Sequence, residues 1–173
     1  DKWFLNEKDR TAIGAYHTFE EVDQFADIFR LHLKKLLRRL LPKPNNIPKP
    51  ISNFVGREAL VADIKTKILE GDDRLICVLG AGGTGKTRVA IRAARDLLPD
   101  FDDGVFLVRL ASVRQGEMIP SAIAASLDIK HSEHTSMLAA VIETLRAKNL
   151  MLVIDNLEQI TDAAHQINQL HQQ

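Results

Sequence analysis

The sequence contains a single cysteine and no long apolar run. Cys77 has no cysteine partner within the 173 residues, so an intramolecular disulfide cannot form, which excludes a small secreted fold held by disulfides and fits a reducing compartment. No apolar stretch approaches the roughly 20 residues needed to cross a bilayer, and residues 1–10 lack the basic leader and apolar run of a signal peptide. We therefore predict a cytoplasmic protein, and Asp1 in the place of an initiator methionine predicts a chain cut at its front.

A net charge is also missing, because 23 Lys and Arg residues balance 23 Asp and Glu residues. A chain that is 45% hydrophobic at zero net charge can bury a core, which excludes a wholly disordered protein. The balance hides one basic stretch, since residues 28–50 hold seven bases and no acid. Such a stretch favours nucleic acid or an anionic lipid surface as a partner.

The acids that precede this stretch support a plainer interpretation. Glu20, Glu21, Asp23 and Asp27 lie at the start of a helix predicted over residues 19–41, and the bases lie toward its end. The helix dipole favours that distribution without any ligand. We interpret the segment as a solvated helix, and we expect no membrane partner and contact with nucleic acid only through domains outside this sequence.

The helix over residues 19–41 is predicted from apolar residues that recur every three or four positions. A capping-box spacing starts at Thr18, Pro42 ends the helix, and the Pro-rich residues 42–51 are predicted to form a semi-extended linker. The wide apolar stripe must be covered by other apolar surface. The candidates are residues 1–17, the following domain, a partner and sequence missing from the front. The stripe consists of Val22, Phe25, Phe29, Leu33, Leu36, Leu37 and Leu40.

Residues 52–173 alternate between strand and helix patterns, which predicts an α/β domain with three layers and a parallel sheet. Three runs are apolar throughout, as is typical of strands buried on both faces, at 75–79, 105–108 and 150–154. Cys77 lies inside the first run and is expected to be buried and inert. Helices are predicted at 57–70, with Gly71 as C-cap, and at 86–98, 118–127, 135–148 and 157–171.

A glycine-rich octet follows the first predicted strand and precedes the helix at 86–98. It matches G-x-x-x-x-G-K-[ST] at every fixed position. Glycines let the backbone curl so that its N–H groups point at phosphate oxygens, Lys86 brings a positive charge to the β- and γ-phosphates, and the Thr87 hydroxyl can ligate Mg²⁺. The octet therefore predicts a P-loop site for ATP or ADP with Mg²⁺. Its residues are Gly80, Ala81, Gly82, Gly83, Thr84, Gly85, Lys86 and Thr87.

A P-loop needs an acid at the end of a second buried strand to hold Mg²⁺. Asp155 follows the apolar run 150–154 and is our candidate for a metal ligand beside Thr87; a helix N-cap is its alternative role. Many P-loop ATPases carry a catalytic Glu at the next position, which here holds Asn156, and Asn cannot accept a proton. Glu158 is therefore a candidate catalytic residue together with Lys86 and Asp155. If Glu158 is instead a solvated acid, hydrolysis is slow.

Three motifs resemble the STAND class of signal-transduction ATPases, which contains NB-ARC and AfsR/LuxR-type bacterial regulators. They occur in family order within residues 52–173, as NFVGRE at 53–58, GVFLVRLA at 104–111 and LVIDNLE at 152–158. The resemblance implies that Val55 and Arg57 contact the nucleotide, because the hhGRE element of the family lies along the adenine. It also implies a slow ATPase that uses ATP/ADP exchange as a conformational switch, with flanking effector and sensor domains and self-association.

The resemblance has a weaker part and one departure. Residues 1–41 are similar to the tail of an effector domain that precedes such ATPases. The family places a fourth strand between the P-loop strand and the strand of the metal-binding acid, and a winged helix follows, whereas this chain stops at Gln173. We therefore expect a truncated sheet with a gap or an improvised pairing at its middle. Two other functions stay open: a small-molecule kinase, and a non-enzymatic interaction module that works through the basic helix 19–41.

Overall fold

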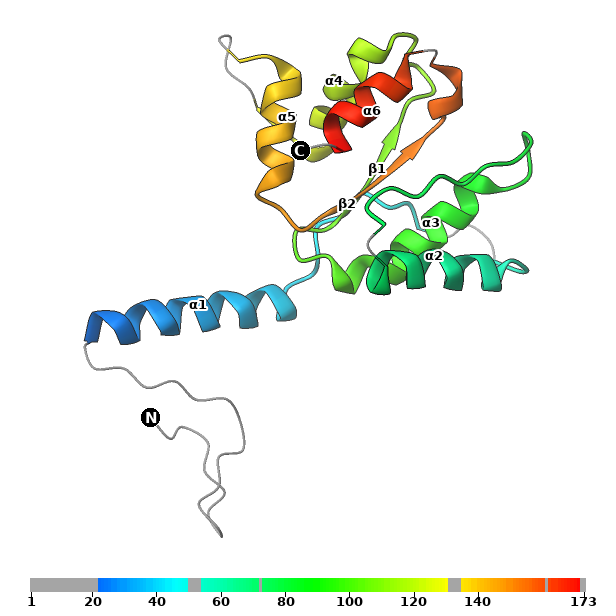
Figure 1. Ribbon diagram of the computed structural model, residues 1–173. Coiled ribbons are helices and arrows are strands. Elements are labelled where there is room, and N and C mark those ends of the chain that lie inside the picture. Colours follow the sequence, from blue (N-terminus) through cyan, green and yellow to red (C-terminus); the bar gives the residue numbers. More distant parts are fainter. Residues whose placement is uncertain (1–21, 50–53, 72, 131–134, 161, 172–173) are drawn as a thin grey trace. The chain divides into compact units, whose positions relative to one another are not determined.

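The computed structural model describes residues 22–49, 54–71, 73–130, 135–160 and 162–171, which Figure 1 draws in colour. The chain divides into two compact units, Asp1–Pro42 and Lys43–Gln173, and we treat each by itself. Among the helices in these ranges, none is long and apolar enough to cross a membrane.

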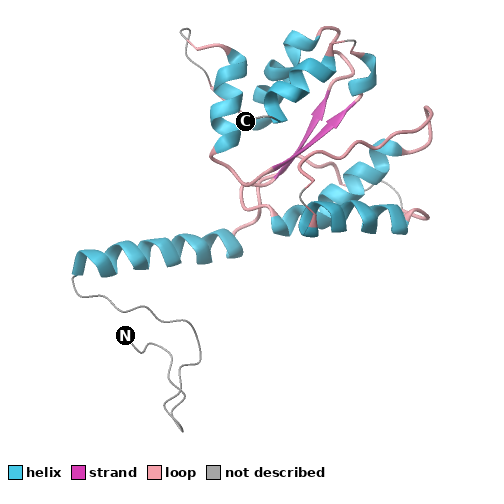
Figure 2. Ribbon diagram, viewed as in Figure 1, coloured by secondary structure: helices cyan, strands magenta, loops and turns pink. Residues whose placement is uncertain are grey.

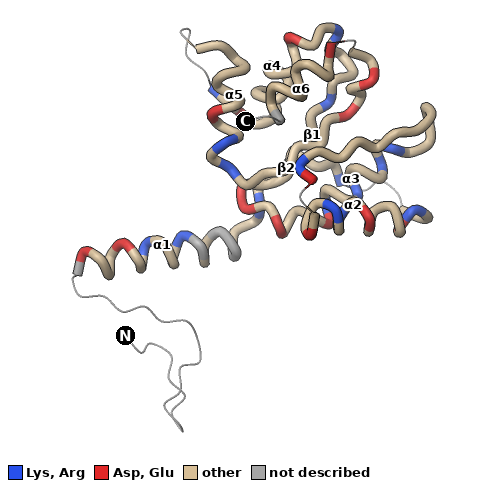
Figure 3. The backbone as a smooth tube through the Cα atoms, in the orientation of Figure 1, with Lys and Arg blue, Asp and Glu red and all other residues tan. Residues whose placement is uncertain are grey.

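The described part of the first unit is one helix, α1 (Val22–Leu40). It confirms the helix predicted over 19–41 as far as the described residues reach, and Thr18 lies outside them. Figure 3 shows acids near the start of α1 and bases after them, and Asp27 pairs with Arg30 at 3.6 Å. The apolar stripe of α1 stays in contact with solvent, because Phe29, Leu33, Leu36 and Leu37 are between 41% and 53% exposed.

The second unit is built on two parallel strands, β1 (Val105–Arg109) and β2 (Met151–Asp155). Helices lie on both sides of this sheet (Figures 1 and 2), with α2 (Glu58–Glu70) and α3 (Lys86–Leu97) on one side and α4 (Ile119–Leu127), α5 (Met137–Arg146) and α6 (Ala163–His171) on the other. Arg109 lies opposite Asp155, so the carboxyl ends of both strands meet at one edge. The unit is an α/β P-loop fold with three layers, as predicted.

The side chains of β1 point alternately into two cores. Val105 and Leu107 pack against Ala94 of α3, and all three are at most 5% exposed. Val108 points the other way, into a core shared with α4, α5 and α6. Both faces of β1 are therefore covered, which explains why the run is apolar without alternation. The fully buried side chains of the second core are Val108, Leu110, Ile119, Ile123 and Val141.

The prediction of a strand at 75–79 is wrong, because these residues form no strand. Ile76 and Val78 are partly buried against α2 and α3, whereas Leu79 is 89% exposed and Cys77, expected to be buried, is exposed as well. A strand requires a hydrogen-bonded neighbour, and β2 pairs only with β1 within the described part of the chain. The segment therefore packs one face against α2 and α3 and leaves the other exposed.

The other predicted elements are confirmed with shifted ends. The helix predicted at 157–171 divides into a 3₁₀ turn, Leu157–Gln159, and α6, because Ile160 is extended and buries its side chain. Gly71 follows α2 as predicted, but its φ of −93° is not left-handed. Glycine provides space there instead, since an added Cβ would lie 2.6 Å from the carbonyl oxygen of Lys67.

Residues 43–48, part of the predicted linker, lie along the edge of β1, and we call them the strap. Asn45 forms a parallel bridge with Val105, whose N–H donates to the carbonyl of Pro44 at 3.1 Å. Lys43 forms an ion pair with Asp102 at 2.5 Å. These residues of the predicted linker belong to the second unit in the structure.

Replacing Gly104 with alanine is expected to lower the free energy of unfolding by about 1–3 kcal/mol. Gly104 has a φ of +97°, and a Cβ added there would overlap the carbonyl oxygen of Pro44. Urea denaturation followed by circular dichroism measures the change. Gly82→Ala is the matched control, since its added Cβ meets nothing within 4 Å, and it should cost less than about 0.5 kcal/mol. An equal loss in both variants would contradict the steric argument.

Candidate functional site

The glycine-rich octet 80–87 forms a loop that leads directly into α3. Gly83 and Gly85 have φ values of 74° and 81°, which side chains disfavour, so glycine suits both positions. The Thr84 hydroxyl donates to the carbonyl of Ala81 at 2.8 Å, and the Thr84 N–H approaches the same oxygen at 3.4 Å. Because α3 begins at Lys86, the N–H groups of its first turn, which have no acceptor within the helix, lie at the end of this loop.

Lys86 turns back across the loop. Its ammonium group donates to the carbonyl of Gly80 at 2.8 Å and to that of Ala81 at 3.2 Å. A Cβ added at Gly80 would lie 3.2 Å from the Thr84 hydroxyl oxygen, so a side chain would be crowded at that position. The loop therefore forms a cradle that carries a positive charge, which suits an anion such as phosphate.

Thr87 and Asp155 are brought together from positions 68 residues apart. The Thr87 hydroxyl donates to Oδ1 of Asp155 at 2.7 Å, and both side chains are partly buried. Asp155 is the last residue of β2, and its carbonyl accepts the N–H of Leu110 at 3.0 Å, which holds the end of β2 beside the end of β1. The fold thus places one carboxylate and one hydroxyl next to the glycine-rich loop.

This donor set fits Mg²⁺. Mg²⁺ prefers oxygen ligands and is commonly held by one or two carboxylates together with substrate phosphates and water, rather than by a cage of protein ligands. Thr87 and Asp155 supply two such oxygens beside the cradle. The described residues contain no group of three or more His, Cys, Asp or Glu side chains that could hold a metal ion by itself.

Glu158, the candidate catalytic acid, is not bonded to this pair. It lies in the 3₁₀ turn after Asn156, whose left-handed φ of 66° redirects the chain at the end of β2. Its side chain is exposed, and among the described residues it has no hydrogen bond or ion pair with the loop or with Asp155. The structure therefore joins Thr87 to Asp155, with Lys86 next to Thr87 at the start of α3, and gives Glu158 no bond to them.

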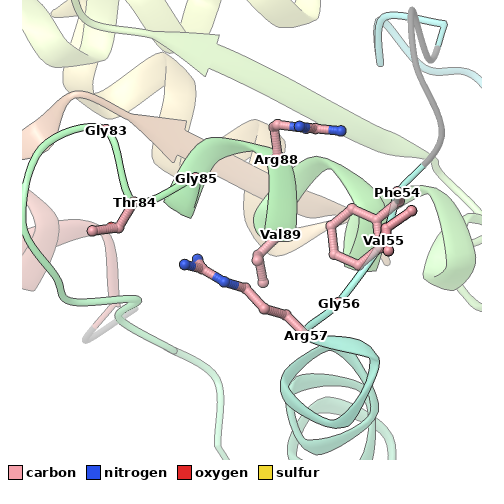
Figure 4. A pocket seen from close by; sticks show the side chains of 9 residues that line it. All are labelled: Phe54, Val55, Gly56, Arg57, Gly83, Thr84, Gly85, Arg88 and Val89. Atoms are coloured by element: carbon pink, nitrogen blue, oxygen red, sulfur yellow. The ribbon is translucent and has the colours of Figure 1, made fainter.

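A pocket of about 270 Å³ opens beside the loop, between the start of α2 and the start of α3. Figure 4 shows Phe54 and Val55 at one end of it and Gly83 at the other. Apolar and aromatic groups at one end and a phosphate cradle at the other match the two parts of a nucleotide. The lining residues are Phe54, Val55, Gly56, Arg57, Gly83, Thr84, Gly85, Arg88 and Val89.

The two residues that the family resemblance singled out, Val55 and Arg57, both line this pocket. Val55 is 87% exposed, so its side chain is available for contact. Arg57 has a left-handed φ of 67°, and Figure 4 shows its side chain reaching from the start of α2 toward the loop. Its Nη1 atom lies 3.7 Å from the place where a Cβ on Gly85 would be.

Four lining residues were not predicted as site residues: Phe54, Gly56, Arg88 and Val89. Phe54 precedes the two predicted contacts and is held by Arg92, whose guanidinium carbon lies 5.7 Å from the ring centroid. Arg88 and Val89 follow the octet directly on α3. Arg88 and Val89 could have been predicted from their closeness to the octet in the sequence, because residues in the first turn of a helix lie close to the loop that precedes it.

Comparisons with known proteins agree with this geometry. A family model described as AAA domain matches residues 69–173. An uncharacterized protein of Mycobacterium tuberculosis is 23% identical over 146 residues, which are 82% of this chain and 37% of that protein. A putative HTH-type transcriptional regulator of Mycobacterium tuberculosis is 27% identical over 97 residues, 56% of this chain and 11% of that protein. The regulatory protein AfsR of Streptomyces griseus is 26% identical over 125 residues, 66% of this chain and 13% of that protein.

The chain spans about a third of the length of the first of these relatives and little more than a tenth of the other two. No solved structure matches it significantly. The AAA-domain match covers more than half of the chain and includes both the glycine-rich loop and Asp155. The chain therefore belongs to the AAA-domain family of P-loop nucleotide-binding proteins.

Proposed function

We propose that the chain is the nucleotide-binding core of a regulatory ATPase of the STAND class, in which exchange of ATP and ADP with Mg²⁺ switches conformation. The observation that carries the proposal is the 2.7 Å hydrogen bond between Thr87 and Asp155. It joins the end of the glycine-rich loop to the end of a buried strand. A P-loop ATPase needs a hydroxyl and a carboxylate at this point, beside the phosphates.

The phosphate end of the site is assigned to residues 80–87. The loop N–H groups and the start of α3 would bind phosphate oxygens, and Lys86, now bonded to the carbonyls of Gly80 and Ala81, would contact the β- and γ-phosphates. Thr87 and Asp155 would hold the metal ion. Mg²⁺, when bound, would neutralise charge on the phosphates.

The base end of the site is assigned to the pocket beside α2. Phe54 and Val55 offer apolar surface for an adenine, and Arg57 and Arg88 line the space between that surface and the loop. The cation–π contact with Arg92 holds Phe54 in place. The assignment is supported by the shared pocket, because one cavity joins the base side to Gly83 and Gly85 of the loop.

A regulatory role is supported by the names of two relatives. One is described as a putative HTH-type transcriptional regulator and the other as the regulatory protein AfsR. We extend this role to the present chain, with residues 1–41 as a helical arm of an effector domain, residues 42–51 as a linker and residues 52–173 as the nucleotide-binding domain. Flanking sensor domains and self-association would convert the nucleotide state into an output.

Hydrolysis by this chain is expected to be slow, below about 10⁻² s⁻¹. Asn156 cannot act as a base, and Glu158 is exposed and not bonded to the site. Positioning and charge stabilisation supply nearly all catalysis of phosphoryl transfer, and they are incomplete here. Single-turnover assays with radiolabelled ATP measure the rate, with Lys86→Ala as the background and Glu158→Gln as the test of the acid. An unchanged rate in Glu158→Gln would identify Glu158 as a solvated side chain.

Multiple-turnover assays and binding assays separate the alternatives. Several turnovers per second that disappear in Lys86→Ala would contradict the slow-switch proposal. Transfer of the label to a small-molecule acceptor would identify a kinase. Tight binding of a macromolecule by the basic helix 19–41, in a chain with no affinity for nucleotide, would identify an interaction module.

A further inference from the structure

The strap, residues 43–48, replaces a neighbouring strand at the outer edge of β1. The N–H of Leu107 donates to Oδ1 of Asn46 at 2.6 Å, and Nδ2 of Asn46 donates to the carbonyl of Leu107 at 3.0 Å. One side-chain amide thus satisfies both backbone groups of a strand residue. Together with the bond from Val105 to Pro44, these contacts cover an edge that would otherwise be open.

The strap also contacts α3. Ile47 packs in the same apolar cluster as Ala94 of α3 and Val105 of β1. The guanidinium group of Arg95, also on α3, donates a hydrogen bond to the carbonyl of Pro48. The strap is therefore held by two elements, the edge of β1 and the second half of α3.

Helix α3 is the helix that begins at the glycine-rich loop. Lys86 and Thr87 are its first two residues, and Ala94 and Arg95 lie about two turns further along. The helix has 12 residues and is hydrogen-bonded along its length, so it moves as a rod roughly 18 Å long. A ligand that fixes the first turn of α3 therefore also restricts the residues that hold the strap.

We infer that docking of the strap is coupled to occupation of the phosphate loop, so that bound nucleotide favours the docked strap and the docked strap tightens nucleotide binding. The inference rests on the proposed function, because it requires a nucleotide at residues 80–87. Coupling between two sites is reciprocal and changes both equilibria by the same factor. Since the strap follows directly on Pro42 in the sequence, the coupling would carry the nucleotide state to the segment that joins the two units.

Hydrogen exchange of the Val105 and Leu107 amides, read by NMR on the full chain, reports the docked strap directly. Both N–H groups donate to strap atoms, to Pro44 and Asn46 respectively. Saturating ADP with Mg²⁺ is expected to slow their exchange at least about fivefold, the lower end of typical coupling. Asn46→Ala should speed the exchange of both amides. It should also weaken ADP binding by the same factor by which ADP slows their exchange in the wild type.

Asn45→Ala is the matched control. The hydrogen bonds of the Asn45 side chain stay within the strap, at 3.0 Å to the carbonyl of Lys43 and 3.3 Å to the N–H of Ile47, so this variant should keep the ADP effect. Asn46→Asp keeps the acceptor for Leu107 and loses the donor, so it should lie between wild type and Asn46→Ala. If Asn46→Ala fails to fold, the same measurements can be made on Asn46→Asp.

The outcomes distinguish this inference from the proposed function. If calorimetry shows ADP binding but the Val105 and Leu107 amides exchange equally fast with and without ADP, the coupling is wrong and the proposed function stands. The coupling is also wrong if the Leu107 amide becomes unprotected in Asn46→Ala but the variant binds ADP with wild-type affinity. If ADP does not bind at all, the proposed function and the coupling fall together.

Discussion

Replacement of Lys86 by alanine is expected to weaken ATP binding about 100-fold. The Lys86 ammonium lies in the loop, bonded to two carbonyls of residues 80 and 81, where it can move onto a phosphate with little reorganisation. Hydrogen bonds to charged groups contribute about 1.5–3 kcal/mol each, which corresponds to roughly 10- to 150-fold in affinity. Because the side chain is only half-buried, its removal should leave the free energy of unfolding nearly unchanged.

Titration calorimetry with ATP measures this effect, and Lys67→Ala is its matched control. Lys67 is a lysine on α2 whose ammonium bonds to Asp63 at 2.9 Å, and the hydrogen bond and charge of Asp63 raise the pKa of Lys67. It is charged at neutral pH and does not line the pocket. Its removal should therefore leave ATP affinity unchanged. Wild-type affinity in Lys86→Ala would show that the octet is a glycine-rich turn without a role in phosphate binding.

Replacement of Asp155 by asparagine is expected to abolish the strengthening of ATP binding by Mg²⁺ while leaving binding in EDTA nearly intact. Asn keeps an oxygen that can accept the Thr87 hydroxyl, so the 2.7 Å bond between the loop and β2 can persist. The negative charge is lost, and a carboxylate is a far better ligand for Mg²⁺ than a neutral amide. We expect affinity in Mg²⁺ to fall by about tenfold or more, which equals about 1.4 kcal/mol.

The measurement is a pair of titrations with ATP, one in EDTA and one in Mg²⁺, for wild type and variant. Asp63→Asn serves as control, because it removes a carboxylate whose ion pair with Lys67 is exposed on α2, and it should keep the full Mg²⁺ effect. A full Mg²⁺ effect in Asp155→Asn would mean that Asp155 only links β2 to the loop. A loss of binding in EDTA as well would mean that the Thr87–Asp155 bond is needed to hold the loop.

Much of the fold follows from local patterns. The helices and the strands β1 and β2 were predicted within a few residues, because their apolar periodicity, prolines and glycines act within one element. The glycine-rich loop before α3 was located from its motif, since a fixed set of glycines, a lysine and a hydroxyl residue defines it within eight positions. Asp155 was predicted from the apolar run before it, and the structure adds that it bonds to Thr87.

The failed prediction at 75–79 has a different cause. An apolar run indicates that a segment can be a strand, but a strand exists only if another strand pairs with it. Here Ile76 and Val78 find α2 and α3, while no described strand lies beside the segment. Cys77 is exposed for the same reason. The sequence pattern of a single segment contains no information on whether its neighbour is present.

The sequence by itself determined the place of the glycine-rich loop, the position of Asp155 after an apolar run and the α/β order, because each depends on residues close together in the chain. The tertiary structure alone decided which side chains meet over long separations. It bonded Thr87 to Asp155, joined Phe54 and Arg88 to the pocket, and docked Asn46 on Leu107. Such contacts depend on how strands and helices pack on one another. A hydrogen bond between residues 61 positions apart produces no local sequence pattern from which it could be predicted.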